Sequence, residues 1–160
     1  MRVLAFDPGY DRLGIAVVEQ TQKNRKTILF SDCLMSSKKN DFNTRLYTIG
    51  KKVRDVIEKY SPDECAQETL YFAKNTTTAL KVSEIRGVCN YLAQDVGCEI
   101  YEYTPNQIKV AITSYGRATK KDMNTMIPKL IKLPEKKYLD DEIDAIAVAL
   151  THLVSRTSSL

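Results

Sequence analysis

The sequence predicts an α/β domain built on a mixed sheet, and the order of its apolar segments is the main reason. Three short apolar stretches come first, a helix-spaced pattern follows, and strand and helix patterns then alternate towards the C-terminus. Strands joined by a tight turn pair antiparallel, whereas a crossover helix allows them to run parallel. We expect one domain over residues 1–155, followed by a polar tail over residues 156–160.

Turn residues and breakers delimit the first elements. Residues 2–6 and 14–18 are apolar runs around Asp7-Pro8-Gly9, which is typical of a β-hairpin, and residues 26–35 form a third strand. Apolar residues at helical spacing predict a helix over residues 42–60, which Ser61-Pro62 ends. Residues 65–70 then read as a strand reached by a crossover.

The remaining elements continue this alternation. A long helix is expected over residues 75–95, closed by Gly97, and residues 99–103 alternate as the fifth strand. Thr104-Pro105 and Thr119-x-x-Asp122 are typical helix starts, and the second of these helices should continue to Leu133, before Pro134. The last helix is expected over residues 141–155.

Composition excludes several classes of protein. No apolar stretch approaches the roughly 20 residues needed to cross a bilayer, and the N-terminus leads into a strand, so we expect a cytoplasmic protein without a membrane partner. The net charge of +4 permits nucleic-acid binding without establishing it. The cysteines lack zinc-ligand spacing, and we expect each to be a buried free thiol: Cys33, Cys65, Cys89 and Cys98.

A carboxylate stands inside an otherwise apolar helical run. Asp144 lies in the segment Ile143 to Leu150, so we expect it to be pressed towards the interior beside a cation, a hydrogen-bond network or a metal. Asp141 lies one helical turn earlier on the same side. Asp7 ends the first strand and Glu68 lies near the end of the fourth, so they converge if these strands are neighbours.

Four carboxylates at one place favour a hard divalent cation such as Mg²⁺ or Mn²⁺. Two such ions, about 3.5–4 Å apart, activate a water and stabilise the leaving oxygen in phosphodiester cleavage, so the pattern indicates a metal-dependent nuclease. Simpler interpretations stay open: Asp7 as a turn residue, Glu68 as a solvent-facing strand residue, and Asp140, Asp141 and Glu142 as charges that favour the helix macrodipole.

Three motifs occur in order along nearly the whole chain. They are Asp7-Pro8-Gly9 with Gly14, then Glu68-x-x-Tyr71-Phe72-Ala73-Lys74-Asn75, and finally Asp141-x-x-Asp144-Ala145-Ile146-Ala147 with Thr151-His152. Together they resemble the RuvC family of Holliday junction resolvases. The resemblance implies a ribonuclease H-like fold with a mixed five-stranded sheet flanked by helices. It also implies Mg²⁺-dependent paired nicks in four-way DNA junctions during recombination and repair, a homodimer that pairs partly through residues 75–95, and a branch-migration motor complex as partner.

The resemblance implies roles for individual residues. Asp7, Glu68, Asp141 and Asp144 match the catalytic metal ligands. Lys109 and Lys120 match basic positions that assist catalysis or bind phosphate; Lys120 and Lys121 stand at a helix N-terminus, an unfavourable place for a cation unless an anion sits there. Tyr71 and Phe72 are alternative residues for stacking on a base at the opened junction. Further DNA-binding candidates are Lys74, Lys81, Arg86, Arg117 and Lys121.

Other functions compete with this interpretation. The segment Asp11-Arg12-Leu13-Gly14-Ile15-Ala16 is similar to YqgF-type nucleases, so a nuclease that processes ribosomal RNA is the alternative. A phosphotransferase of the actin-like group would need a later glycine-rich loop and a second lobe, and an inert nucleic-acid-binding module would not need all four carboxylates. His152, the only histidine, lies on an apolar helix, which favours a structural role over histidine-based hydrolysis.

Overall fold

A five-stranded mixed sheet forms the centre of the molecule, seen in a computed structural model that describes residues 1–21, 25–70 and 76–158. The strands, in the spatial order β3-β2-β1-β4-β5, are β1 (Arg2–Pro8), β2 (Arg12–Gln20), β3 (Lys26–Met35), β4 (Glu64–Glu68) and β5 (Glu99–Tyr103). The first three pair antiparallel, whereas β4 runs parallel to both β1 and β5. This arrangement confirms the predicted mixed α/β sheet.

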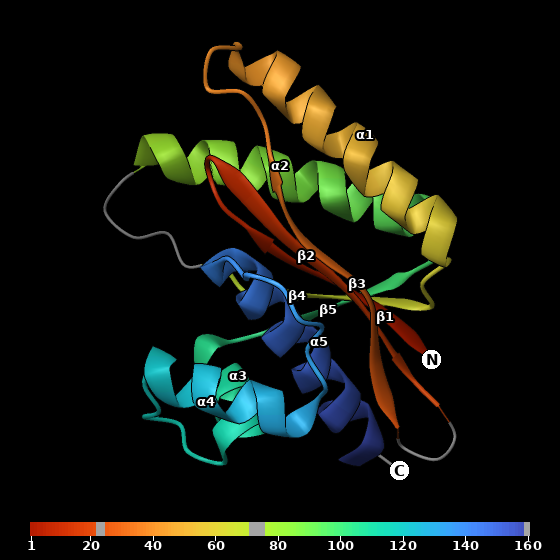
Figure 1. The fold of residues 1–160 in the computed structure, drawn as a ribbon. Coiled ribbons are helices and arrows are strands. Elements are labelled where there is room, and N and C mark those ends of the chain that lie inside the picture. The colour runs from red at the N-terminus through yellow and green to blue at the C-terminus, as the bar shows by residue number, and fades with distance from the viewer. Residues whose placement is uncertain (22–24, 71–75, 159–160) are drawn as a thin grey trace.

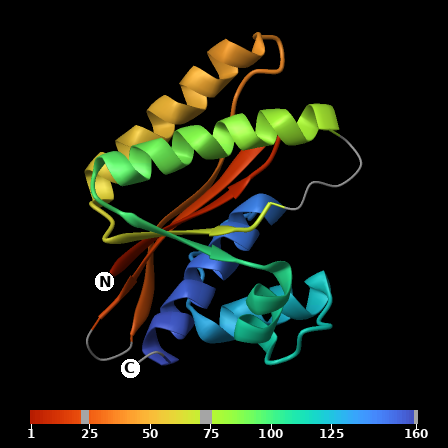
Figure 2. The ribbon, with the colours of Figure 1, turned by 180° about the vertical axis from the view of Figure 1, so that it is seen from behind.

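Helices cover both faces of the sheet (Figures 1 and 2). One face carries α1 (Phe42–Tyr60) and α2 (Thr76–Asp95), and the other carries α3 (Pro105–Thr113), α4 (Lys120–Leu130) and α5 (Asp140–Ser158). Each helix start that the sequence predicted from Thr104 and Thr119 is a capping box. Within the described parts of the chain, no helix has the length and apolar character needed to cross a membrane.

Strand alternation divides the core into two layers. In β1, Leu4 and Phe6 point to the layer of α1 and α2, whereas Val3 and Ala5 point to the layer of α5. The α5 face also carries the small residues Ala16 and Ala66. Because these side chains are short, α5 can lie close against the centre of the sheet.

Several boundaries differ from the predicted ones. β1 extends to Pro8 and β2 begins at Arg12, so both strands are longer at the turn than predicted. The amide of Gly9 donates a 2.8 Å hydrogen bond to the Arg12 carbonyl and closes this tight turn. β4 ends at Glu68 and not at residue 70. α4 ends at Leu130, because Ile131 turns to extended backbone and its side chain enters the core. α5 continues through three residues of the expected tail, to residue 158.

The four cysteines are free and buried, as the sequence predicted. Cys65, Cys89 and Cys98 belong to the core layer under α1 and α2. Burial raises the pKa of the Cys89 thiol to about 12, so this group stays protonated at neutral pH.

Candidate catalytic carboxylate site

Asp7 and Glu68 lie at the carboxyl ends of two adjacent parallel strands. β1 and β4 are paired through Phe6 and Gln67, and each acidic residue follows directly in its own strand. The expected neighbourhood of the first and fourth strands is therefore confirmed. This edge of the sheet is where ligands bind in open α/β folds.

A glycine in β2 lets α5 bring Asp141 to the same edge. Gly14 is the antiparallel partner of Asp7. A Cβ built on Gly14 would lie 1.8 Å from the backbone carbonyl oxygen of Asp141, so any larger residue would push the start of α5 away. The close approach of helix and strand is thus a direct consequence of glycine at this position.

The four predicted carboxylates share one electrostatic environment. The pKa of Asp7 is raised from 3.8 to about 7. Burial is the largest cause, and the nearby charges of Asp144, Asp141 and Glu68 contribute the rest. Burial and the charge of Asp144 likewise raise the pKa of Glu68. A group of mutually repelling carboxylates is the kind of oxygen donor set that a hard divalent cation neutralises.

Both predicted lysines lie beside these carboxylates. Lys120 Nζ is 2.9 Å from Asp144 Oδ2 and 3.5 Å from Asp140 Oδ2. Burial lowers the pKa of Lys120, but its contacts with Asp144 and Asp140 outweigh this effect and leave the pKa raised. These acidic partners therefore offset the cost of a cation at the α4 N-terminus. Lys109 opposes the rise in the pKa of Glu68, and both lysines line a hollow of about 260 Å³ with Glu68 and Asp144.

Asp144 is more accessible than its apolar surroundings predicted. Its side chain is 38% exposed, so the expected burial in the interior is wrong, whereas the expected neighbouring cation is confirmed by Lys120 at 2.9 Å. The buried carboxylate of this helix is Glu142, which is 3% exposed and lies 2.6 Å from the Nζ of Lys136. The segment from Ile143 to Leu150 is apolar on most sides because α5 packs both on the sheet and against α3. Asp141 and Asp144 are one helical turn apart and share the edge of α5 that faces the site.

Two further residues at the site were not predicted to belong to it. Arg12 Nε lies 3.0 Å from Asp141 Oδ2, and the thiol of Cys33 lies 3.7 Å from the same oxygen. Strand periodicity could have indicated Arg12, because it stands two residues before Gly14 and therefore on the face of β2 that α5 covers. No comparable pattern pointed to Cys33.

The carboxylate oxygens of the site suit a divalent cation, but two of these carboxylates are paired with basic side chains. Asp141 contacts Arg12, and Asp144 contacts Lys120. Among residues 1–21, 25–70 and 76–158, no group of three or more acidic, histidine or cysteine side chains is placed to hold a metal ion. The pKa of Asp7 is nevertheless raised, first by burial and then by the charges of Asp144, Asp141 and Glu68, while Lys120 acts in the opposite direction.

The other predicted DNA contacts are spread over several surfaces. Arg117 and Lys121 are exposed near the start of α4. Lys81 lies over the rings of Tyr10 and Phe42, 5.2 Å from each centroid. Arg86 is 13% exposed and its guanidinium pairs with Glu102 of β5. Tyr71, Phe72 and Lys74 lie outside the described residues.

His152 has a structural environment, as its place on an apolar helix indicated. Its ring is fully buried, with Nδ1 2.7 Å from the Tyr103 hydroxyl and Nε2 2.5 Å from Glu64. Burial lowers the pKa of His152. It stands about two helical turns beyond Asp144, in a separate cluster.

Comparisons with known proteins identify the family of this chain. The family model described as "Crossover junction endodeoxyribonuclease RuvC" matches residues 3–152. RuvC from Petrotoga mobilis is 41% identical over 152 residues, which cover 95% of this chain and 93% of the relative. RuvC from Thermotoga petrophila is 40% identical over 152 residues, with 95% and 92% covered.

Solved structures show the same fold. The structure of Thermus thermophilus RuvC in complex with a Holliday junction substrate has a TM-score of 0.91 at 28% identity, and the match covers 99% of this chain and 96% of that one. The yeast mitochondrial Holliday junction resolvase Ydc2, at 14% identity and a TM-score of 0.72, is similar in fold alone, with 98% and 79% covered. These matches confirm the ribonuclease H-like fold and give no support to the YqgF alternative. The chain belongs to the RuvC family of crossover junction endodeoxyribonucleases.

Proposed function

We propose that this protein cuts four-way DNA junctions by metal-dependent hydrolysis, with Asp7, Glu68, Asp141 and Asp144 as the metal ligands. The observation that carries the site is its geometry: Asp7 and Glu68 lie at the ends of the paired parallel strands β1 and β4, and the close approach at Gly14 brings the Asp141 end of α5 to the same edge. Membership of the RuvC family implies dependence on a divalent metal ion. Two Mg²⁺ ions per site, replaceable by Mn²⁺, are our proposal for this chain.

The protein's own side chains would prepare the site for a phosphodiester. Such ions, when bound, supply activation of a water and stabilisation of the leaving oxygen. Lys120 holds Asp144 in place through a 2.9 Å contact, and together with Lys109 it brings positive charge to the 260 Å³ hollow beside Glu68. A DNA backbone is polyanionic, so this hollow is electrostatically suited to the cleaved strand.

Junction DNA is the proposed substrate because a relative of the same fold, at 28% identity, is seen with a Holliday junction substrate. Arg117 and Lys121 are exposed near the start of α4 and are proposed backbone contacts. Base stacking by Tyr71 or Phe72, backbone contact by Lys74, Lys81 and Arg86, a motor partner and cytoplasmic location stay predictions.

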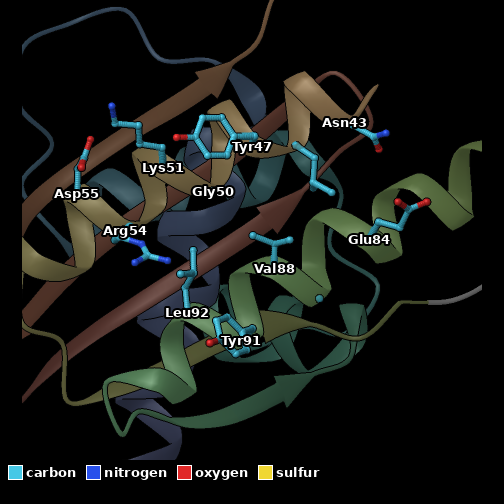
Figure 3. A pocket seen from close by; sticks show the side chains of 12 residues that line it. Asn43, Tyr47, Gly50, Lys51, Arg54, Asp55, Glu84, Val88, Tyr91 and Leu92 are labelled. Carbon is cyan, nitrogen blue, oxygen red and sulfur yellow. The ribbon is translucent and has the colours of Figure 1, made fainter. Parts of the chain in front are cut away.

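A second copy of the chain is the proposed partner at the groove between α1 and α2 (Figure 3). This hollow, of about 930 Å³, lies on the sheet face opposite to α5, so it is remote from the carboxylates. Tyr47 and Tyr91 line it and are 73% and 65% exposed. Large aromatic side chains at a rim between helices suit an interface between proteins. A two-fold pair of sites would match the near two-fold symmetry of a junction.

The decisive experiment compares three substrates and two variants. Synthetic four-way junctions, linear duplex and structured RNA are incubated with the protein and Mg²⁺. We expect paired nicks in the junction, loss of cutting with Asp144→Asn, and retained cutting with Asp140→Asn, since Asp140 contacts Lys120 but is not a proposed ligand. Preferential cleavage of RNA, or junction cutting unaffected by Asp144→Asn, would contradict the proposal.

A further inference from the structure

Arg12 contacts a site carboxylate although no motif of the sequence assigns it there. Its Nε lies 3.0 Å from Asp141 Oδ2; the side chain of Arg12 is 45% exposed and that of Asp141 is 21% exposed. A guanidinium stays charged at any pH the protein experiences. Asp141 therefore already has a permanent cation on one of the oxygens that a divalent ion would need.

The backbone of Arg12 is fixed, while its side chain has room to move. The turn before it is closed by the hydrogen bond from the Gly9 amide to the Arg12 carbonyl. Arg45, which is 7% exposed, donates to the Tyr10 carbonyl at 3.0 Å and pairs with Asp11 at 3.1 Å. These bonds hold the turn against α1. The half-exposed guanidinium can then change partners without a change in the fold.

A second hollow adjoins the site on the Arg12 side. It measures about 490 Å³, and its lining includes Gly9, Tyr10, Arg12, Ser36, Lys38 and Asp141. Asp11 also lines this hollow and lies 2.6 Å from the Nζ of Lys38, so Arg12 is the basic side chain in it that is not paired with Asp11. Arginine binds phosphate well because its planar fork matches two oxygens at once.

We propose that Arg12 is a placeholder cation that exchanges between Asp141 and DNA. In the metal-free protein it neutralises Asp141, it competes with the divalent ion for that carboxylate, and it moves onto a backbone phosphate in the adjoining hollow when the ion binds. The reason is electrostatic: Asp141 would attract the guanidinium less once its charge were compensated by a bound cation, and Arg12 would then find its next anionic partner in an arriving phosphate. This inference rests on the proposed metal site.

The first test measures Mn²⁺ binding to the DNA-free protein by electron paramagnetic resonance. Arg12→Gln removes the competitor, so we expect Mn²⁺ affinity to rise about two- to five-fold, the effect of a partly exposed ion pair. The control is Lys38→Gln, which lines the same hollow but pairs with Asp11, and which should leave the affinity unchanged. If Arg12 only braced Asp141, its removal would weaken Mn²⁺ binding. Unchanged or weaker affinity therefore overturns the proposal.

The second test measures junction binding against salt concentration, with Ca²⁺ replacing Mg²⁺. Loss of one phosphate contact in Arg12→Gln should reduce the slope of log affinity against log salt by about 0.9. An unchanged slope overturns the exchange onto DNA.

The Asp141→Asn variant separates this inference from the proposed function. It should weaken Mn²⁺ binding, and the gain from Arg12→Gln should vanish in its background, because the two residues act on one contact. If Asp141→Asn leaves Mn²⁺ binding unchanged, the metal site itself is wrong. If it weakens binding while Arg12→Gln gives no gain, the metal site stands and the placeholder role is wrong.

Discussion

The pKa of Asp7 responds to all the carboxylates of the candidate site. Asp7 lies at the carboxyl end of β1. Burial and the charges of Asp144, Asp141 and Glu68 raise its pKa to about 7, while the charge of Lys120 acts in the opposite direction. The carboxyl group is thus poised to lose its proton near neutral pH. A divalent cation needs the ionised form, so binding of the ion and release of the proton are coupled.

The raised pKa of Asp7 predicts a pH dependence of stability in the metal-free protein. The pKa of Asp7 is higher in the folded protein than its ordinary value of 3.8, so its stabilising contribution is present below pH 3.8 and is lost as the pH rises through about 7. Asp7→Asn should therefore raise the free energy of unfolding by roughly 1–4 kcal/mol at about pH 8, and by less at about pH 5.

Urea unfolding in the presence of a chelator measures this difference. Addition of Mn²⁺ should stabilise the native protein at the higher pH and should have a smaller effect on Asp7→Asn. The same gain in stability at both pH values would show that Asp7 does not titrate in this range.

Among the elements, α5 is the one that completes the site. It delivers Asp141 and Asp144 to the ends of β1 and β4, and its first turn rests on the backbone of β2 at Gly14. At its start, the buried Glu142 pairs with Lys136, whose Nζ also donates to the Ser31 carbonyl in β3 at 2.7 Å. The position of the acidic edge of α5 is therefore set by contacts with two strands.

Gly14→Ala tests this dependence on a single close approach. The added methyl group would overlap the Asp141 carbonyl, so α5 must shift; we expect a loss of about 1–3 kcal/mol in the free energy of unfolding. Displacement of Asp141 by about 1 Å should also slow junction cleavage about 100-fold. Gly87→Ala on α2 is the contrast for stability alone: its Cβ would meet no atom within 4 Å, and alanine is the better helix former, so we expect a gain of about 0.5–1 kcal/mol. Full cleavage by Gly14→Ala would show that α5 does not need this contact.

At the scale of the whole molecule, the sheet separates two functional faces. The α5 face and the strand ends carry the carboxylates, whereas the opposite layer carries the groove between α1 and α2. A partner could occupy that groove without covering the catalytic edge. The two proposed functions, cutting and pairing, can therefore be altered separately.

Tyr91→Glu should shift the protein from dimer to monomer, because it replaces an exposed aromatic side chain of the proposed interface with a charge. Sedimentation velocity at several concentrations measures this change. Tyr115→Glu is the matched control: Tyr115 is 58% exposed, close to the 65% of Tyr91, but it lies outside the groove. A wild-type protein that stays monomeric, or a Tyr91→Glu variant that stays dimeric, would exclude this face as the interface.

Local signals in the sequence were enough to predict the order of the elements and the helix starts at Thr104 and Thr119, and they also supplied the candidate carboxylates, because caps, strand periodicity and motifs are local. Tertiary structure alone decided which charges are buried and which are paired. Glu142 lies in the core and Asp144 at an accessible edge, although they are two residues apart on one helix. The contacts of Arg12 with Asp141 and of Lys120 with Asp144 join residues 129 and 24 positions apart. Such contacts depend on how α5 crosses the sheet, and a local pattern carries no information about that distance.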